Sequence, residues 1–476
     1  MNQVTPIALH RDPTDPAGPT GQLATWLANL RLEDIPDAVR RRAAHLLLDG
    51  VACALVGARL PWSAVAVGSL SRLEGSGPAT LIGWDRSLPP STATLLNSTF
   101  IQGFELDDVH PFAPLHNASL VLPPLLALAQ MREGVTGAMF LKAAVAGFEV
   151  GPRAGLALGG IEMLTRGWHS GAVFGTHGAA AASGSLLGLD AAGFEDALGL
   201  AATQSAGLMS AQFEAMCKRM HHGFSARAGL VAAWLAADGY TGIKRVFEQD
   251  YGGFLTMFGE AHSNDASQVS RELGSIWETT RITVKPYAAM GGLLAPVAAI
   301  CRLRNERPFR PDEIDAIDIW VGNAVFHHGA FPIERPLTSV GAQMSLAYTA
   351  SVAAIDGAAM VRQYSAERIG ADDVWALIPR IRMHVDERFQ GSPKLKLRTR
   401  VRIQFTDGTA RETEESIRFA DEITDAEIEA KFRTLCDGVI PAERRDRIAE
   451  AVLGIEHAAD LETLLRLLGP EVDSPL

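Results

Sequence analysis

Residues 282–304, ITVKPYAAMGGLLAPVAAICRLR, mark a change in the character of the chain. Here a short extended segment leads into a helix. From about Thr20 to Gly259, helical periods rich in Ala and Leu follow one another, and runs of β-branched residues are scarce. Beyond the stretch, AIDIWVG (316–322) alternates like a strand, and RTRVRIQFTDGTARETEE (398–415) carries an Asp-Gly hairpin signal. The sequence therefore predicts a helical segment followed by a mixed α and β segment.

Helical patterns return near the C-terminus, and each carries acidic residues early. Examples of the helical patterns along the chain are 21–30, 38–58, 91–108, 171–189, 425–436, 443–456 and 460–468. The predicted fold is mainly α with an α+β insert. We expect a large helical domain formed by both chain ends, residues 1–277 and 421–476, and a smaller α+β lid domain, residues 278–420.

Length and charge limit the possible functions. The chain has 476 residues, with 43 Lys and Arg against 55 Asp and Glu, which gives a formal charge of −12. This length suits two or three domains. The negative charge disfavours nucleic acid and anionic membrane surfaces as partners. An anionic small molecule is still a possible ligand, because a local pocket can differ in sign from the whole protein.

Cysteine usage and the terminal sequence indicate a cytoplasmic protein. The four cysteines (Cys53, Cys217, Cys301 and Cys436) fall in no CxxC or Cys/His metal spacing, which argues against a disulfide framework and a zinc module. About twenty N-terminal residues carry no apolar or Arg-rich targeting segment and are expected to form a loose leader. The apolar runs are too short, or too rich in Gly and Ala, to predict a membrane span.

Several common catalytic motifs are absent from the sequence. It contains no GxxxxGK[ST], GxSxG or HExxH, and the glycine-rich run GAVFGTHG (171–178) follows no buried strand. We therefore expect no nucleotide site and no cofactor. What remains is a set of His and Lys clusters in surroundings of low charge.

The first cluster is ELDDVH (105–110), with His116 six residues beyond it. Three carboxylates and two histidines at a helix end could bind a divalent cation or tune imidazole pKa values for acid–base chemistry. The alternative is the C-terminus of a helix with solvated acids. A metal site is less favoured, because no second ligand set of matching spacing is present.

The second cluster is GWHSG (167–171), at the start of the Ala-rich segment. Its glycines would let a substrate come close to His169, although a lone histidine is more often a structural core residue. His177, eight residues later, looks structural in the same way.

The third cluster is CKRMHHGFSAR (217–227), within an apolar sequence. Lys218 and Arg227 would destabilise such surroundings unless they were paired, and a bound carboxylate is one way to pair them. A surface turn with exposed cations is the alternative. The adjacent His221 and His222 point about 100° apart on a helix, so they are poorly placed to hold one ion.

The fourth cluster is VKPYAAMGG (284–292), which includes Lys285. Its glycines suit a loop whose backbone amides approach a ligand at a helix N-terminus. A plain connection between a strand and a helix explains the pattern nearly as well.

In this order, these stretches resemble the MmgE/PrpD family, which includes 2-methylcitrate dehydratases and cis-aconitate decarboxylases, and among its subgroups they are most similar to the fungal type of decarboxylase. The likeness covers essentially the whole chain. It is carried by residues 46–63, 100–123, 167–175, 197–230, 251–258 and 332–348. The resemblance implies a helical domain with an α+β lid, a homodimer, no cofactor and a site between the two domains.

The resemblance also implies site residues. It places a catalytic or substrate-binding role on Glu105, His116, His169 and Lys218, and adds Tyr348 from a later block. With the clusters above, the predicted catalytic residues are His116, His169 and Lys218, and no metal is expected. The predicted substrate-binding residues are Glu105, Asp107, His221, Lys285 and Tyr348.

The expected function is decarboxylation of cis-aconitate to itaconate and CO2, with Lys218 holding the anion and histidines moving protons. Two positions differ from the animal decarboxylases: Val109 replaces a threonine, and Met290 replaces a histidine. Met290 cannot exchange a proton, so two alternatives stay open. One is a 2-methylcitrate dehydratase or another hydro-lyase or isomerase of polycarboxylates, and the other is a catalytically silent binding protein of the family.

Overall fold

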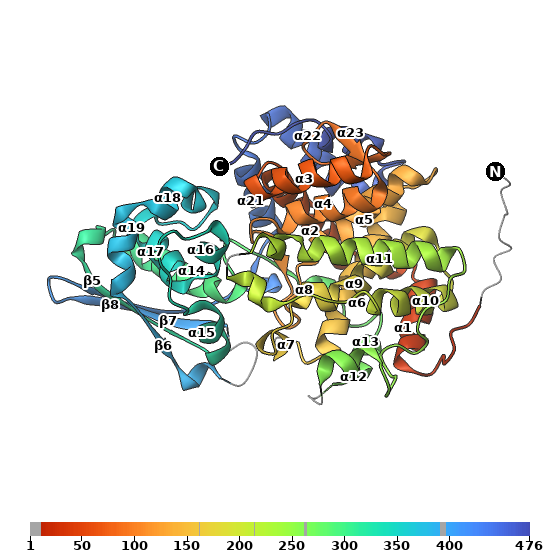
Figure 1. Cartoon of the computed structure of the whole chain (residues 1–476), viewed down its shortest axis with the longest axis horizontal. Coiled ribbons are helices and arrows are strands. Elements are labelled where there is room, and N and C mark those ends of the chain that lie inside the picture. Colours follow the sequence, from red (N-terminus) through yellow and green to blue (C-terminus); the bar gives the residue numbers. More distant parts are fainter. Residues whose placement is uncertain (1–10, 161, 214, 261–263, 391–396) are drawn as a thin grey trace.

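The computed structural model describes residues 11–476, except for 161, 214, 261–263 and 391–396. The chain is 60% helical and 9% strand, which confirms the predicted mainly α class with a small α+β part. Figure 1 shows a large helical part beside a smaller part that contains a sheet. The first ten residues of the expected leader lie outside the described residues. Its following residues are attached to the helical part, because Arg11 Nε donates to Asp190 at 3.1 Å and Thr14 Oγ1 donates to Glu195 at 2.9 Å.

The helical part packs its helices closely, as the small residues predict. Its helices are α1 Pro19–Asn29, α2 Asp37–Ala58, α3 Pro61–Glu74, α4 Pro90–Gln102, α5 Ala118–Met131, α6 Gly137–Ala157, α7 Glu162–Thr165, α8 Ser170–Val173, α9 Gly175–Leu187, α10 Ala191–Ala202, α11 His221–Ala237, α12 Phe254–Gly259 and α13 Ser267–Ser270. Helices α6 and α9 are in extensive contact. A Cβ on Gly147 would lie 2.9 Å from the carbonyl oxygen of Gly178, so a glycine is required for this approach.

The last helices of the chain return to the helical part. Helices α21 Asp425–Cys436 and α22 Ala442–Leu453 contact α2, and α23 Glu462–Leu468 packs on α22. Figure 1 shows this C-terminal group beside α2, α3 and α4. Strand β4 Thr283–Val284, near the predicted start of the lid, pairs with β3 Asp108–Val109 of the helical part. The domain boundaries given above stay a prediction.

The α+β part, residues 287–417, is built on a four-stranded sheet in the order β6-β5-β7-β8. Strand β5 Ile314–Val321 runs parallel to β6 Ile381–Val385 and antiparallel to β7 Arg398–Phe405. The predicted hairpin joins β7 to β8 Ala410–Ser416, and Gly408 has the left-handed φ of +84° that this turn needs. The helices of this part are α14 Leu294–Glu306, α15 Asn323–Gly329, α16 Ser339–Met344, α17 Leu346–Asp356, α18 Ala366–Gly370 and α19 Asp372–Leu377. The remaining two-stranded sheet pairs β1 Ala79–Leu81 with β2 Arg86–Leu88 in the helical part.

Two local predictions differ from the structure. The helix expected over 91–108 is α4, which ends at Gln102, so the acidic cluster lies beyond it in a turn and in β3. The Ala-rich segment is interrupted at Phe174, where the short α8 ends and α9 begins. Within the described residues, no single helix is long and apolar enough to cross a membrane, although the bent pair α2 and α3 meets that test by length and composition.

Candidate active site

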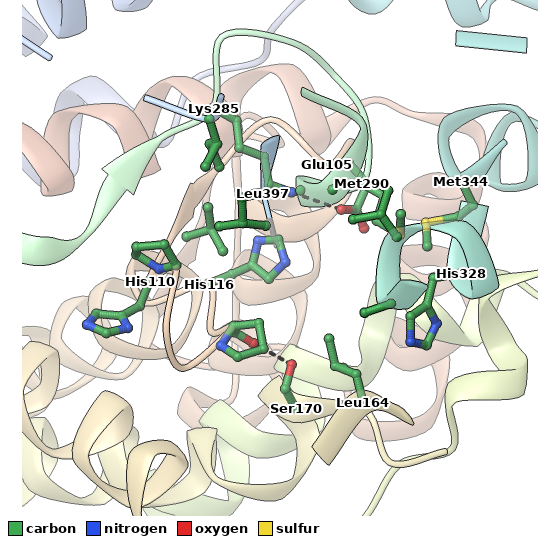
Figure 2. Close-up of a pocket in the computed structure, with 18 of the residues that line it drawn as sticks. Glu105, His110, His116, Leu164, Ser170, Lys285, Met290, His328, Met344 and Leu397 are labelled. Atoms are coloured by element: carbon green, nitrogen blue, oxygen red, sulfur yellow. Dashed lines mark hydrogen bonds and ion pairs between the residues drawn. The ribbon is translucent and has the colours of Figure 1, made fainter. Parts of the chain in front are cut away.

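A cavity of about 110 Å³ lies between the helical part and the α+β part. This is several times the space that one water molecule needs, so a small organic ligand can enter. Its lining comes from both parts of the chain: Glu105, Val109, His110, Pro111, Pro114, His116, Leu164, His169, Ser170, Met209, Lys218, Lys285, Met290, Gly291, Gly292, Ala324, Val325, His328, Met344, Leu397 and Ile417. Figure 2 shows most of these side chains around the cavity.

The predicted residues Glu105, Lys218 and Lys285 meet at the charged end of this cavity. Glu105 follows α4 in a left-handed conformation, with φ of +56°, which turns its side chain inward from the helix end. Lys285 Nζ donates to Glu105 Oε2 at 2.9 Å, and Lys218 donates to Oε1. Arg219, which is not among the predicted site residues, reaches the same oxygen at 3.5 Å. One buried carboxylate is therefore shared by three buried cations.

This arrangement leaves an excess of positive charge. Burial alone would raise the pKa of Glu105, but Lys218 and Lys285 hold it well below its usual range, so this carboxyl is ionised. Burial lowers the pKa of Lys218. Burial raises the pKa values of the nearby Asp107 and Asp108 carboxyls to about 7, so that each carries only part of a negative charge near neutral pH. The alternative of a surface turn with exposed cations is wrong, because Lys218 and Arg219 are both buried.

His116 is oriented by Asp107, which lies behind it. Its Nδ1 lies 2.9 Å from Asp107 Oδ1. An ionised Asp107 accepts a hydrogen bond from Nδ1–H of His116. The lone pair on Nε2 of His116 is then free to face the cavity. Burial, followed by the charge of Lys285, lowers the pKa of His116 well below its usual value. The solvated helix end considered for this cluster is wrong, since Glu105, Asp107 and Asp108 are all buried.

Four histidines pack against one another on the helical side of the cavity. The ring centre of His169 lies 4.5 Å from that of His221 and 5.5 Å from that of His222, and His116 lies 5.0 Å from His222. Ser119 donates its hydroxyl proton to the carbonyl of His116, so at 2.7 Å it accepts from Nδ1 of His222. His222 therefore carries its proton on Nδ1. Burial and the nearby His221 lower the pKa of His169 well below its usual value.

Gly171 makes this packing possible. A Cβ at this position would lie 1.8 Å from Nε2 of His222. The second glycine of the GWHSG motif thus admits a histidine ring from α11, whereas the motif predicted that its glycines would admit a substrate. His169 lines the cavity just before α8, as the motif predicted.

The α+β part supplies the opposite, mostly apolar wall, where Met290, noted above as a replacement of a histidine, is joined by His328 of α15. His328 was missed from the sequence, although the pair His327-His328 stands in it. No spacing to the other histidines marks it, because α15 reaches the cavity only through tertiary packing. Figure 2 shows His116 and His328 on different sides of the cavity.

Some predicted or considered residues lie elsewhere. The described residues that surround the cavity do not include Tyr348, whose hydroxyl donates to the carbonyl of Gln363 in the core of the α+β part. His221 contacts the cavity histidine His169 and is not itself part of the lining. Arg227 lies half-buried over the ring of Phe224 on α11. His177, as expected, is a core residue, packed on Phe247 and Phe254.

No group of three or more His, Cys, Asp or Glu side chains in the described part of the chain is placed to hold a metal ion. His110, which also lines the cavity, is occupied structurally. Its Nε2 lies 3.0 Å from Glu278, and its Nδ1 accepts from the backbone amide of Ala113. The four cysteines are free, and Cys217 is the exposed one.

Comparison with known proteins covers nearly the whole chain. Residues 21–265 match the model of the MmgE/PrpD N-terminal domain, and residues 287–456 match that of the C-terminal domain. The chain is 42% identical to the cis-aconitate decarboxylase-like protein oryM of Aspergillus oryzae, over 97% of this chain and 99% of that protein. It is 39% identical to a cis-aconitate decarboxylase of Aspergillus terreus, over 97% and 98%. It is 26% identical to the human cis-aconitate decarboxylase, over 95% of both chains.

Proposed function

Because the chain belongs to the MmgE/PrpD family, we propose that it is a carboxy-lyase that converts cis-aconitate to itaconate and CO2 without a cofactor. The relatives at about 40% identity that carry the name of this activity support the reaction type. The proposed site is the cavity between the two parts, with His116, His169 and Lys218 as its catalytic residues.

The observation that carries this proposal is the imbalance of charge around Glu105. Lys218, Arg219 and Lys285 bring three buried positive charges to one carboxylate. Buried cations without counter-charges are strongly destabilising, and a bound anion relieves this cost. A polycarboxylate supplies the missing negative charge and has enough carboxylates to reach His116 and His169 as well. Glu105 and Lys285 are substrate-binding residues in this sense, while Asp107 and His221 position the catalytic histidines.

The reaction needs charge stabilisation and one proton. The carboxylate on the methylene carbon leaves as CO2, and its bonding electron pair forms a new double bond to the central carbon. The electrons of the original double bond move to the far carbon, next to another carboxylate, and give an enolate-like dianion. Lys218 and its neighbouring cations stabilise that charge. A histidine then protonates the far carbon, which completes itaconate.

Proton NMR of the purified protein with cis-aconitate tests the proposal. We expect itaconate to appear, with release of one CO2 per product, in buffer that contains no added metal or nucleotide. A panel with methylcitrate and citrate separates the alternatives. Dehydration of methylcitrate without decarboxylation would replace the proposal with a hydro-lyase. Thermal stabilisation by these polycarboxylates without any turnover would indicate a binding protein.

We also propose that the chain forms a homodimer through one face of α11. Phe224, Val231 and Trp234 lie on this face, at helical spacings of seven and three residues, and are 45%, 36% and 37% exposed. The exposed side chains of Leu208, Phe213 and Met216 lie in the segment just before the helix. Several exposed apolar side chains along one helix face and the segment before it are typical of a protein interface. The surface continues into the segment that carries Lys218, so dimerisation would hold the anion-binding residues in place. A cytoplasmic location stays a prediction.

A further inference from the structure

The cavity wall formed by the α+β part is apolar apart from one residue. Among the described lining residues that follow Lys285, His328 alone has an ionisable side chain. Its apolar neighbours on this wall are Met290, Val325, Met344, Leu397 and Ile417. An imidazole in such surroundings destabilises the fold unless it has a hydrogen-bond partner. Its presence on this wall therefore points to a function.

The Nε2 atom of His328 is buried, and none of the described residues gives it a hydrogen-bond partner. The helix that carries it is firmly packed. Helix α15 contacts η5 Gly291–Leu293, and a Cβ on Gly329 would lie 2.8 Å from the side chain of Leu293 and 3.5 Å from Cε of Met290. His328 is therefore held at the cavity by a closely packed helix, and its buried Nε2 is left without a partner among the described residues.

We propose that His328 is a further catalytic residue, which delivers the proton to carbon after CO2 has left. This inference rests on the proposed decarboxylation. It assigns the carbon protonation to the wall opposite the cation cluster, and it leaves His116 and His169 to hydrogen-bond the substrate carboxylates.

The distribution of charge in the cavity carries this assignment. Lys218, Arg219 and Lys285 attract the carboxylates of a polyanion to the helical side. The carbon skeleton then faces this wall, because His328 carries the one ionisable side chain among its described residues and the other side chains there are apolar. The proton must reach carbon, and His328 is the acid on that side.

The local electrostatics agree with the geometry. Burial lowers the pKa values of His116 and His169, and nearby buried cations, Lys285 for His116 and Lys218 for His169, lower them further. Burial, followed by the neighbouring His327, lowers the pKa of His328, and no buried Lys or Arg adds to this effect. In the step itself, the imidazolium of His328 gives its Nε2 proton to the far carbon, where the double-bond electrons form the new C–H bond. Neutral His328 then recovers a proton from solvent.

The test compares His328→Gln with His327→Gln, the exposed neighbour on the same helix, which is not part of the cavity lining. Each variant is assayed with cis-aconitate in 1H2O and in 2H2O, together with its melting temperature. We expect H328Q to lose about 10²-fold or more in kcat, with KM changed by less than threefold and melting temperature kept. H327Q should match the wild type. In 2H2O, wild-type itaconate should carry one deuterium at the saturated methylene in a single configuration, and the residual H328Q product should carry it in both.

The outcomes are distinguishable from those of the proposed function. If the wild type is active and H328Q keeps full activity, the role of His328 is overturned while the decarboxylase proposal stands. The same holds for an H328Q defect confined to KM, or for residual product with an unchanged configuration. If the wild type forms no itaconate at all, the decarboxylase proposal fails and this role fails with it.

Discussion

Lys285 Nζ and Glu105 Oε2 form a buried ion pair of 2.9 Å between residues 180 positions apart in the chain. Glu105 follows α4 of the helical part, and Lys285 follows β4 on the way into the α+β part. The pair joins the two parts at the charged end of the cavity. Because Lys218 and Arg219 share the same carboxylate, Glu105 is the residue on which the whole cation cluster depends.

Glu105→Gln should destabilise the protein strongly. The variant leaves three buried cations without their common counter-charge, and breaking a buried pair in this way typically costs about 3–5 kcal/mol. We expect a clear fall in melting temperature, partly restored by millimolar cis-aconitate or citrate, since a bound polyanion replaces the lost charge. Differential scanning fluorimetry with and without these anions measures both effects. An unchanged melting temperature would mean that groups other than Glu105 neutralise the positive charge of the cluster.

Lys218→Gln and His169→Gln should remove activity with little change in stability. Glu105 keeps Lys285 and Arg219 as partners when Lys218 is lost, so its buried negative charge stays paired. The transition state loses a buried charge-assisted contact, which corresponds to about 10²–10³-fold in kcat/KM. Steady-state kinetics beside thermal melts checks this prediction. A large loss of stability would instead assign these residues to the structure.

Asp107→Asn should change how stability depends on pH. The pKa of Asp107 is about 7 in the fold, above its ordinary value of 3.8, so its contribution to stability is fully present below about pH 4 and is lost as the pH rises through about 7. Asn does not titrate. The free energy of unfolding of the variant should therefore rise relative to that of the wild type across this window, by up to about 1.4 kcal/mol per pH unit. Melting temperatures at pH 5, 6 and 7.5 measure the difference.

The exposed Asp250→Asn serves as the control for this pH series. Its melting temperature should follow the wild type at every pH. If the melting temperature of D107N follows that of the wild type at every pH, protonation of Asp107 beside His116 does not contribute to the stability of the fold.

Gly171→Ala should disturb the histidine cluster. The added methyl group would lie 1.8 Å from His222 Nε2, so the ring must move and with it the contacts to His116 and His169. We expect reduced activity and a lower melting temperature. Gly370→Ala is a matched control, because a Cβ there meets nothing within 4 Å. Wild-type behaviour of G171A would show that His222 has room to rotate away.

Trp234→Glu should weaken the proposed homodimer. A charge placed on the apolar face of α11 opposes its burial against a second copy. Light scattering after size-exclusion chromatography should show a dimer for the wild type and a monomer for W234E. Leu73→Glu, which alters an exposed leucine of α3, should stay dimeric. A monomeric wild type would reject the homodimer, and a dimeric W234E would place its interface elsewhere.

The sequence by itself determined the elements whose signals are local. The helix α2 and the hairpin β7–β8 depend on residue spacing and on one glycine in a left-handed turn, and both lie where they were predicted. Helix ends were less predictable: α4 ends at Gln102, because the chain turns there to bury the acidic cluster.

Only the tertiary structure decided which side chains meet. The clusters pointed to Glu105, His116, His169, Lys218 and Lys285, and all five line one cavity. Nothing in the sequence pattern showed that three cations share one carboxylate, that His328 faces this group across the cavity, or that Tyr348 lies in the core. Contacts between residues more than a hundred positions apart depend on how helices and strands pack together. Hydrophobic burial drives that packing, and it leaves no periodic signature at the polar residues that it brings into contact.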